Sequence, residues 1–174
     1  MERQLLLLGL LRAQKMHGYQ LNEFLERSYD FVTDLKPSTA YYLLDKLATE
    51  GYVQVQVEQV GNRPPRRVYE LTPAGEARFL ELLRANLAGR TAPVYADEIG
   101  LSFMNELSRV EVHHSLAEKC QFIRAELDRL GGMETALRAG GSEQVYLALD
   151  HHLTLLRAEV AWFDNLLERL SKDT

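Results

Sequence analysis

The sequence predicts a mostly α-helical fold with a small α+β wing: an N-terminal winged helix-turn-helix followed by a C-terminal helical dimerisation domain. One observation is a helical segment after Leu35 that is followed by two segments of alternating apolar and polar residues, joined by a basic, proline-containing turn. The other is a long C-terminal helix whose apolar residues recur at spacings of three and four. A linker over residues 89–93 divides the chain into expected domains 1–89 and 90–174.

Length and composition are those of a globular protein. The chain has 174 residues, of which 46% are hydrophobic and 26% are charged. No apolar run approaches the roughly 20 residues that span a bilayer, and Leu5–Leu8 lacks the flanks of a secretory signal. Cys120 is the only cysteine, which excludes an internal disulfide and a cysteine-based zinc site. We therefore expect a cytoplasmic protein with no membrane partner.

Three helices are predicted before the wing. A leucine-rich helix runs from Glu2 to about Ala13, and a second helix runs over 19–27 after a break at His17–Tyr19. The third begins with Pro37 in its first turn and ends at Gly51, which caps it in the left-handed conformation. Its apolar stripe has the helical period and consists of Ala40, Leu43, Leu44, Leu47 and Ala48.

The wing and a fourth helix follow. Residues 52–57 and 67–71 alternate between apolar and polar side chains, as half-buried strands do, and the turn residues of 61–65 lie between them. Thr72 is an N-cap residue followed by Pro73 at the first helical position. The fourth helix is expected to end near Ala88.

Three helical segments are predicted in the second half. A short helix covers 97–107, and Ser108 with Glu111 forms a capping box for a long helix that we expect to stop at Gly131–Gly132. Ser142 then precedes the last helix. This helix has a heptad seam, which predicts dimerisation through Tyr146, Leu149, Leu153, Leu156, Val160, Phe163, Leu167 and Leu170.

The third helix and the wing have the residues of a DNA-binding surface. In a helix-turn-helix, the N-terminal part of the second helix contacts base edges in the major groove, and arginines on a projecting loop suit phosphates or the minor groove. A solvated polar helix and a solvated loop are the ordinary alternatives. However, the turn and the strand after it place three arginines within five residues, with no acid among them. The predicted DNA contacts are Lys36, Ser38, Thr39, Tyr41, Tyr42, Lys46, Arg63, Arg66 and Arg67.

The net charge of −5 is unevenly distributed along the chain. The residues before Gly89 contain eleven basic and eleven acidic side chains, so the whole deficit lies in the second half. Charge near the phosphates matters more for DNA binding than total charge does. Asp45 is a discordant residue on the recognition helix, because phosphate repels a carboxylate; it either accepts a hydrogen bond from cytosine or lies off the interface.

These residues resemble the PadR family of winged-helix transcriptional regulators. The resemblance rests on 16–21 (MHGYQL), on 36–41 (KPSTAY) with Leu44, Leu47, Gly51 and Tyr52, and on 67–75 (RVYELTPAG). The second half is similar in plan to the helical domain of longer, virulence-activator-like members. The resemblance implies a homodimer that binds double-stranded DNA, usually a repressor released by a small-molecule effector. Tyr41 matches the family's tyrosine in the recognition helix, whereas Asp45 stands where a basic residue is common.

Several alternatives remain open from the sequence. The heptad seam can pack within the chain on the helix over 116–130, and the acidic second half is also consistent with a protein-interaction module. The pairs His113–His114 and His151–His152 each point to two helix faces, so neither pair chelates a metal alone. The chain has no nucleophile elbow, P-loop or dinucleotide fingerprint, so we expect no enzyme activity and no cofactor.

Overall fold

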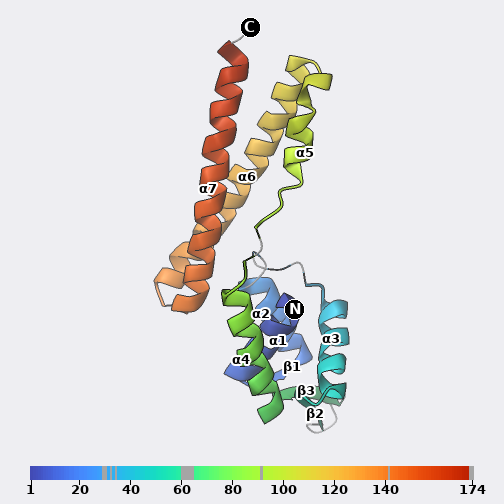
Figure 1. The fold of residues 1–174 in the computed structure, drawn as a ribbon. Helices are drawn as coiled ribbons and strands as arrows, with labels where there is room; N and C mark the ends of the chain where they lie inside the picture. The colour runs from blue at the N-terminus through green and yellow to red at the C-terminus, as the bar shows by residue number, and fades with distance from the viewer. Residues whose placement is uncertain are drawn as a thin grey trace. The chain divides into compact units, whose positions relative to one another are not determined.

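The computed structural model describes residues 1–28, 31, 33, 35–59, 65–90, 92–140 and 142–172, with the side chains of 22 and 26–28 left undescribed. The chain forms two compact units, Met1–Thr91 and Ala92–Thr174 (Figure 1). The first holds all of the strands seen in the described residues, and the second is entirely helical there.

The first unit is a winged helix. Its elements are α1 (Glu2–Ala13), β1 (Met16–His17), α2 (Gly18–Ser28), α3 (Pro37–Thr49), β2 (Val53–Glu58), β3 (Arg66–Leu71) and α4 (Pro73–Leu87). The apolar faces of the helices meet in one core around Leu7, Leu21, Leu44 and Leu47, each no more than 1% exposed. The predicted helix-turn-helix with a two-stranded wing is confirmed.

The sheet contains a strand that the sequence analysis missed. Its order is β1-β3-β2, with both pairs antiparallel, so β3 is the central strand. Tyr69 on β3 lies opposite Met16 on one side and Val55 on the other. From periodicity, the sequence predicts a break between helices at 17–19 and no strand, because two residues are too few to show an alternating pattern. This short pairing places His17 and the start of α2 beside β3.

Two turns fix the ends of the wing. Gly51 has a φ of +80°, the left-handed conformation that favours glycine, so α3 can turn directly into β2. After β3, the Thr72 hydroxyl accepts a hydrogen bond from the Gly75 N–H at 3.0 Å and caps α4. A Cβ on Gly75 would lie 2.0 Å from the Tyr52 carbonyl oxygen, so the close approach of α4 to the wing requires glycine.

The second unit consists of α5 (Asp97–Ser102), a short 3-10 helix η1 (Met104–Glu106), α6 (Arg109–Arg138) and α7 (Glu143–Lys172). The single short helix predicted over 97–107 is thus divided in two. The capping box is confirmed: the Ser108 N–H donates to Glu111 Oε2 at 3.0 Å, and the Ser108 hydroxyl accepts from the Glu111 N–H at 3.3 Å.

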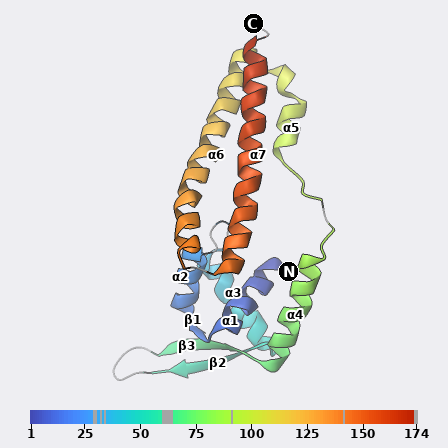
Figure 2. The ribbon, with the colours of Figure 1, turned by 90° about the vertical axis from the view of Figure 1, so that its left-hand side faces the viewer.

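The predicted end of α6 at Gly131–Gly132 was wrong, because the helix continues to Arg138. Each glycine costs a helix about 1 kcal/mol relative to alanine. Packing outweighs that cost: α6 lies alongside α7 (Figure 2), and Leu130, next to the glycines, is fully buried. Neither glycine has a positive φ, so neither acts as a left-handed cap.

The heptad seam of α7 packs within the chain. Val160 and Phe163 form a buried cluster with Cys120 and Ile123 of α6, and Leu156 and Leu167 border it. Leu149 and Leu153 are also fully buried. This is the intramolecular alternative that the sequence left open: Leu149, Leu153, Val160 and Phe163 are buried within one chain, whereas the other four seam residues are half-buried.

Candidate nucleic-acid interface and a pocket in the helical unit

The outer face of α3 carries the predicted groove residues. Because Ala40, Leu44 and Leu47 turn inward, the opposite side of the helix is left open. Tyr42 is 67% exposed, and Tyr41 is 36% exposed. Lys36, Ser38 and Lys46 are exposed as well, whereas Thr39 is half-buried. The helix therefore presents hydroxyl, phenol and ammonium groups, all of which hydrogen-bond to bases or phosphates.

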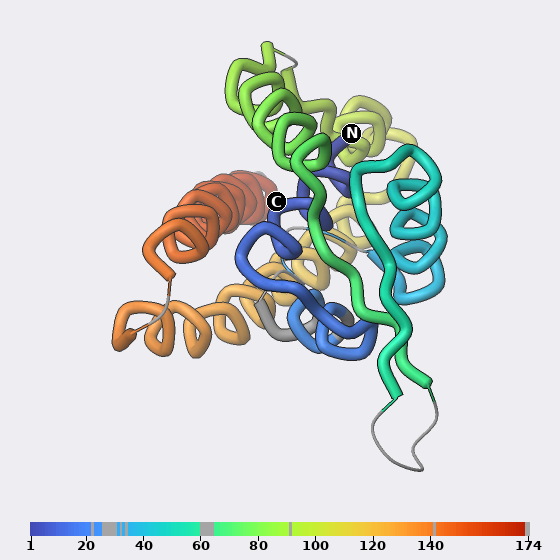
Figure 3. The backbone as a smooth tube through the Cα atoms, turned by 90° about the horizontal axis from the view of Figure 1, so that it is seen from below, coloured from blue at the N-terminus to red at the C-terminus, as the bar shows by residue number. Residues whose placement is uncertain are grey.

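The wing places two of its three predicted arginines beside this helix. Strands β2 and β3 extend beyond the helices of the unit (Figures 2 and 3), and β3 begins with Arg66 and Arg67, both exposed. The Arg66 guanidinium lies 5.3 Å from the centroid of the Tyr19 ring, a cation–π contact. Arg63 falls outside the described residues.

An ion pair connects the wing to the recognition helix. Arg67 Nη2 donates to Asp45 Oδ1 at 2.5 Å, and this hydrogen bond raises the pKa of Arg67. About half of each side chain remains exposed. Asp45, the discordant residue of the recognition helix, thus neutralises a wing arginine. Periodicity alone gave no sign of this partner, because the two residues belong to different elements.

A glycine fixes the position of Tyr41. A Cβ on Gly18 would lie 2.4 Å from Tyr41 Cε1 and 2.6 Å from its hydroxyl oxygen. The ring therefore packs on the bare backbone at the start of α2, which fixes the phenol at the edge of the α3 face. The break predicted at 17–19 gives no sign of this contact, because Gly18 and Tyr41 belong to different elements.

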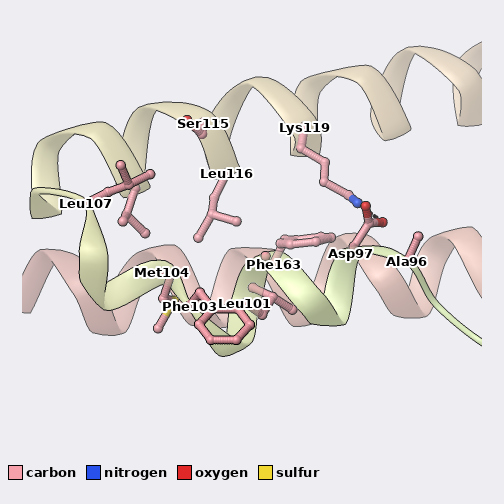
Figure 4. Close-up of a pocket in the computed structure, with 12 residues that line it drawn as sticks. Ala96, Asp97, Leu101, Phe103, Met104, Leu107, Ser115, Leu116, Lys119 and Phe163 are labelled. Carbon is pink, nitrogen blue, oxygen red and sulfur yellow. Dashed lines mark hydrogen bonds and ion pairs between the residues drawn. The ribbon is translucent and has the colours of Figure 1, made fainter.

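The second unit contains a mostly apolar pocket of about 540 Å³ (Figure 4). Leu101 of α5, Met104 of η1 and Phe103 between them line it, together with Leu116 of α6 and Phe163 of α7. The Lys119 ammonium is paired with the Asp97 carboxylate at one edge. A mostly apolar pocket with one cationic group is suited to a small apolar molecule that carries an acid.

The second unit also exposes many large apolar side chains. On α7, Leu147, Leu155 and Trp162 point away from the seam and are about half exposed. A contiguous exposed apolar patch typically marks an interface, so this face of α7 is a candidate interface. The other such residues in this unit are Val94, Tyr95, Ile99, Phe103, Leu107, Val110 and Phe122.

The described part of the chain lacks two further features, a metal site and a membrane span. No three His, Cys, Asp or Glu side chains there gather closely enough to hold a metal ion. His114 lies near the carboxylate of Glu118, with 3.5 Å between His114 Nε2 and Glu118 Oε1. None of the described helices combines the length and the apolar character that a membrane span needs.

Comparisons with known proteins agree with this geometry. The model of the Transcriptional regulator PadR-like family matches residues 7–81. The Negative transcriptional regulator PadR of Bacillus subtilis (strain 168) is 27% identical over 178 residues, covering 96% of each chain.

Solved structures share the fold of the whole chain. The structure of Bacillus subtilis PadR in complex with operator DNA has a TM-score of 0.83 at 23% identity and covers 96% of this chain and 98% of that one. The same protein with p-coumaric acid has a TM-score of 0.81 at 24% identity, covering 97% and 98%. The Vibrio cholerae virulence activator AphA has a TM-score of 0.76 at 22% identity, covering 99% of each chain.

Proposed function

We propose that this chain, a PadR-like transcriptional regulator, represses transcription by binding a specific DNA sequence as a homodimer. The observation that carries the proposal is the open face of α3 joined by the Arg67–Asp45 pair to the arginines of β3. A relative named as a negative regulator, similar over nearly the whole chain, supports repression. Operator DNA in a structure with the same fold supports the DNA ligand. Such a protein acts where the chromosome is, so we place it in the cytoplasm.

The proposed contacts divide by the chemistry of the side chains. Hydroxyl and phenol groups on α3 face base edges in the major groove, where they donate and accept hydrogen bonds. Cationic groups bind phosphates or enter the minor groove. The groove residues are Ser38, Thr39, Tyr41 and Tyr42, and the cationic residues are Lys36, Lys46, Arg63, Arg66 and Arg67.

We assign dimerisation to α7 and the apolar surface around it. A winged helix needs a partner to hold two recognition helices one DNA turn apart, about 34–36 Å. Since α6 covers much of the heptad seam, the contact between chains is expected on the outer face of α7, at Leu147, Leu155 and Trp162. The seam then acts indirectly, because it fixes α7 on α6.

An effector fits the apolar pocket of the second unit. The ligand in the related PadR structure, p-coumaric acid, joins an aromatic ring to a carboxylate, and the pocket offers apolar walls and Lys119. The Lys119 ammonium is already paired with the Asp97 carboxylate, so the carboxylate of an incoming ligand would have to displace Asp97. Because Asp97 is the first residue of α5, this exchange would loosen that helix and so alter the dimer.

Fluorescence tests the effector site. Trp162 is the only tryptophan, and its ring lies 5.1 Å, edge to face, from the ring of Phe163, which lines the pocket. We expect p-coumaric acid to change the Trp162 emission in the native protein and to do so far more weakly in Lys119→Met. Benzoic and cinnamic acids test the same chemistry; no response to any of the three acids would contradict an acid-binding pocket.

DNA binding itself is tested by fluorescence anisotropy. We expect the protein to bind duplexes from upstream of its own gene, or duplexes that it enriches from a random pool, more tightly than scrambled ones, with strong salt dependence. Replacing Arg66 and Arg67 together should weaken binding and lower the salt slope by up to about two. If all duplexes bind equally weakly while the dimer persists, the alternative of a protein-interaction module is favoured instead.

A further inference from the structure

A polar pocket of about 570 Å³ lies in the first unit where β1, α2, α3 and β3 meet. It is distinct from the apolar pocket of the second unit. Rings and guanidinium groups form most of its wall: His17, Tyr19, Tyr41, Arg66, Arg67 and Tyr69. Of these, His17, Tyr19 and Tyr69 belong to none of the DNA contacts proposed above.

Among the described residues, two polar atoms of the lining have no hydrogen-bond partner. They are the Tyr69 hydroxyl and His17 Nδ1. Tyr69 is 0% exposed, and leaving a buried polar group unpaired costs about 1–3 kcal/mol, so native proteins seldom do so without a reason. Burial raises the pKa of the Tyr69 phenol, which therefore stays protonated and can donate its O–H. A ligand in the pocket would complete this hydrogen bond.

The pocket is suited to an anion. Its lining contains two guanidinium groups and, among the described residues, no carboxylate. Arg66 stacks on Tyr19, and Arg67 lies 5.3 Å from the centroid of the Tyr69 ring, so both are held at the wall by ring contacts. Asp45 engages one Nη of Arg67, and the remaining N–H groups of the fork are available to an oxyanion.

The position of the pocket identifies the source of the anion. Tyr41 belongs to α3 and Arg66 to β3, the two elements proposed to enter neighbouring grooves. A DNA strand that passes from one groove to the next crosses the space between them. We propose that this pocket binds one phosphate of the DNA backbone, with Tyr69, Arg66 and His17 as its ligands. The inference rests on the proposed function, because it requires a bound duplex.

Removing one oxygen atom tests the pocket. Tyr69→Phe deletes only the hydroxyl, and because that hydroxyl is unpaired, the variant should melt at the same temperature or higher. Its affinity for a duplex enriched by the native protein should fall roughly tenfold, the value of a hydrogen bond to a charged group. Tyr52→Phe makes the same atomic change elsewhere in the unit and should leave the affinity unchanged.

Neutral phosphates locate the contact. Methylphosphonate replaces each backbone phosphate of the enriched duplex in turn, and affinities are measured for the native protein, Tyr69→Phe and Arg66→Gln. At one position in each half-site, the loss from methylphosphonate and the loss from either variant should fail to add, as expected when both remove the same contact. Arg78→Gln, which removes a charge on α4, is the control. Its loss of affinity and the loss from methylphosphonate should be additive at every position.

The outcomes separate the pocket from the function. Enrichment of a duplex together with unchanged affinity of Tyr69→Phe, or with additivity at every position, would overturn the pocket and leave DNA regulation standing. Failure to enrich any duplex would overturn both. Free phosphate is the other possible source of the anion. If inorganic phosphate shifts the nuclear magnetic resonances of Tyr69 but the losses add at every position of the duplex, the assignment to the DNA backbone would also be overturned.

Discussion

At the scale of single residues, Asp45 has the most specific consequence. Its carboxylate binds Arg67 on a surface proposed to face the phosphates of DNA. The carboxylate therefore repels the phosphates and also neutralises the charge of Arg67. We expect Asp45→Asn to bind DNA more tightly, by roughly three- to tenfold. The effect is modest because solvent screens a half-exposed charge. The salt slope should steepen by up to about one, because Arg67 then meets its phosphate without a competing carboxylate. Anisotropy at several salt concentrations measures both.

A matched pair of residues provides the control. Asp164 binds Arg124 at 2.6 Å with similar exposure, in the other unit. Asp164→Asn changes the net charge equally but lies on α7, so its DNA affinity should match that of the native protein. If Asp45→Asn weakened binding instead, the pair would serve to position Arg67 and not to shield it.

Gly18 is the second residue with a direct consequence for binding. In Gly18→Ala, the new methyl group would overlap the Tyr41 ring, which is a side-chain end that can swing away. Stability should therefore change by less than about 1 kcal/mol, whereas DNA affinity should fall because Tyr41 leaves its place. In a Tyr41→Ala background, Gly18→Ala should have no further effect on affinity. An equal loss in both backgrounds would mean that Gly18 acts through the backbone.

At the scale of elements, the start of α6 has a measurable pH dependence. Hydrogen bonds from the Ser108 hydroxyl and N–H lower the pKa of Glu111 below its ordinary 4.5. A lowered pKa stabilises the folded state above pH 4.5, and this contribution is lost as the pH falls through the folded value. Ser108→Ala should cost about 1 kcal/mol at neutral pH, and the difference from the native protein should shrink in acid.

Thermal melts at pH 7 and in mild acid check this prediction. Ser102→Ala is the control, because the Ser102 hydroxyl donates to the Glu98 carbonyl within α5 and caps no helix. It should melt like the native protein at both pH values. A Ser108→Ala difference that stays constant with pH would assign the cap to the hydroxyl alone, without Glu111.

The same scale shows which elements sequence can predict. The helix-turn-helix, the two wing strands and the capping box follow from periodicity and cap residues, which are local signals. The continuation of α6 past Gly131 depends on α7 and could not be seen locally. Strand β1 is too short for a pattern and exists because β3 pairs with it. The unpaired Tyr69 hydroxyl and the Asp45–Arg67 pair likewise arise only when distant elements meet.

At the scale of the whole molecule, the heptad seam shows the limit of periodicity. The spacing of three and four predicts that another helix packs along the seam. It does not indicate whether that helix belongs to the same chain or to a second chain. Here α6 does so for much of its length. A dimer through α7 can use side chains outside the repeat, such as Leu155 and Trp162, which a heptad search places on the solvent side, together with the half-buried residues of the seam.

That distinction can be tested with two substitutions on one helix. Trp162→Glu places a charge on the outer face, and we expect light scattering to give the mass of one chain while the far-ultraviolet dichroism stays native. Trp162→Phe should remain a dimer. Leu153→Ala opens a cavity in the seam, so it should lower the free energy of unfolding by about 2–5 kcal/mol without separating the chains at temperatures well below melting.

DNA affinity then connects the dimer to function. With two winged helices on one operator, the second contact is intramolecular and raises affinity by on the order of 10²–10⁴. Trp162→Glu should lose this factor on a duplex with two half-sites, yet bind a single half-site as the native protein does. Full affinity of a monomeric Trp162→Glu would show that one winged helix suffices. A dimeric Trp162→Glu would place the contact between chains away from the outer face of α7, and the exposed residues of α5 and α6 would be substituted next.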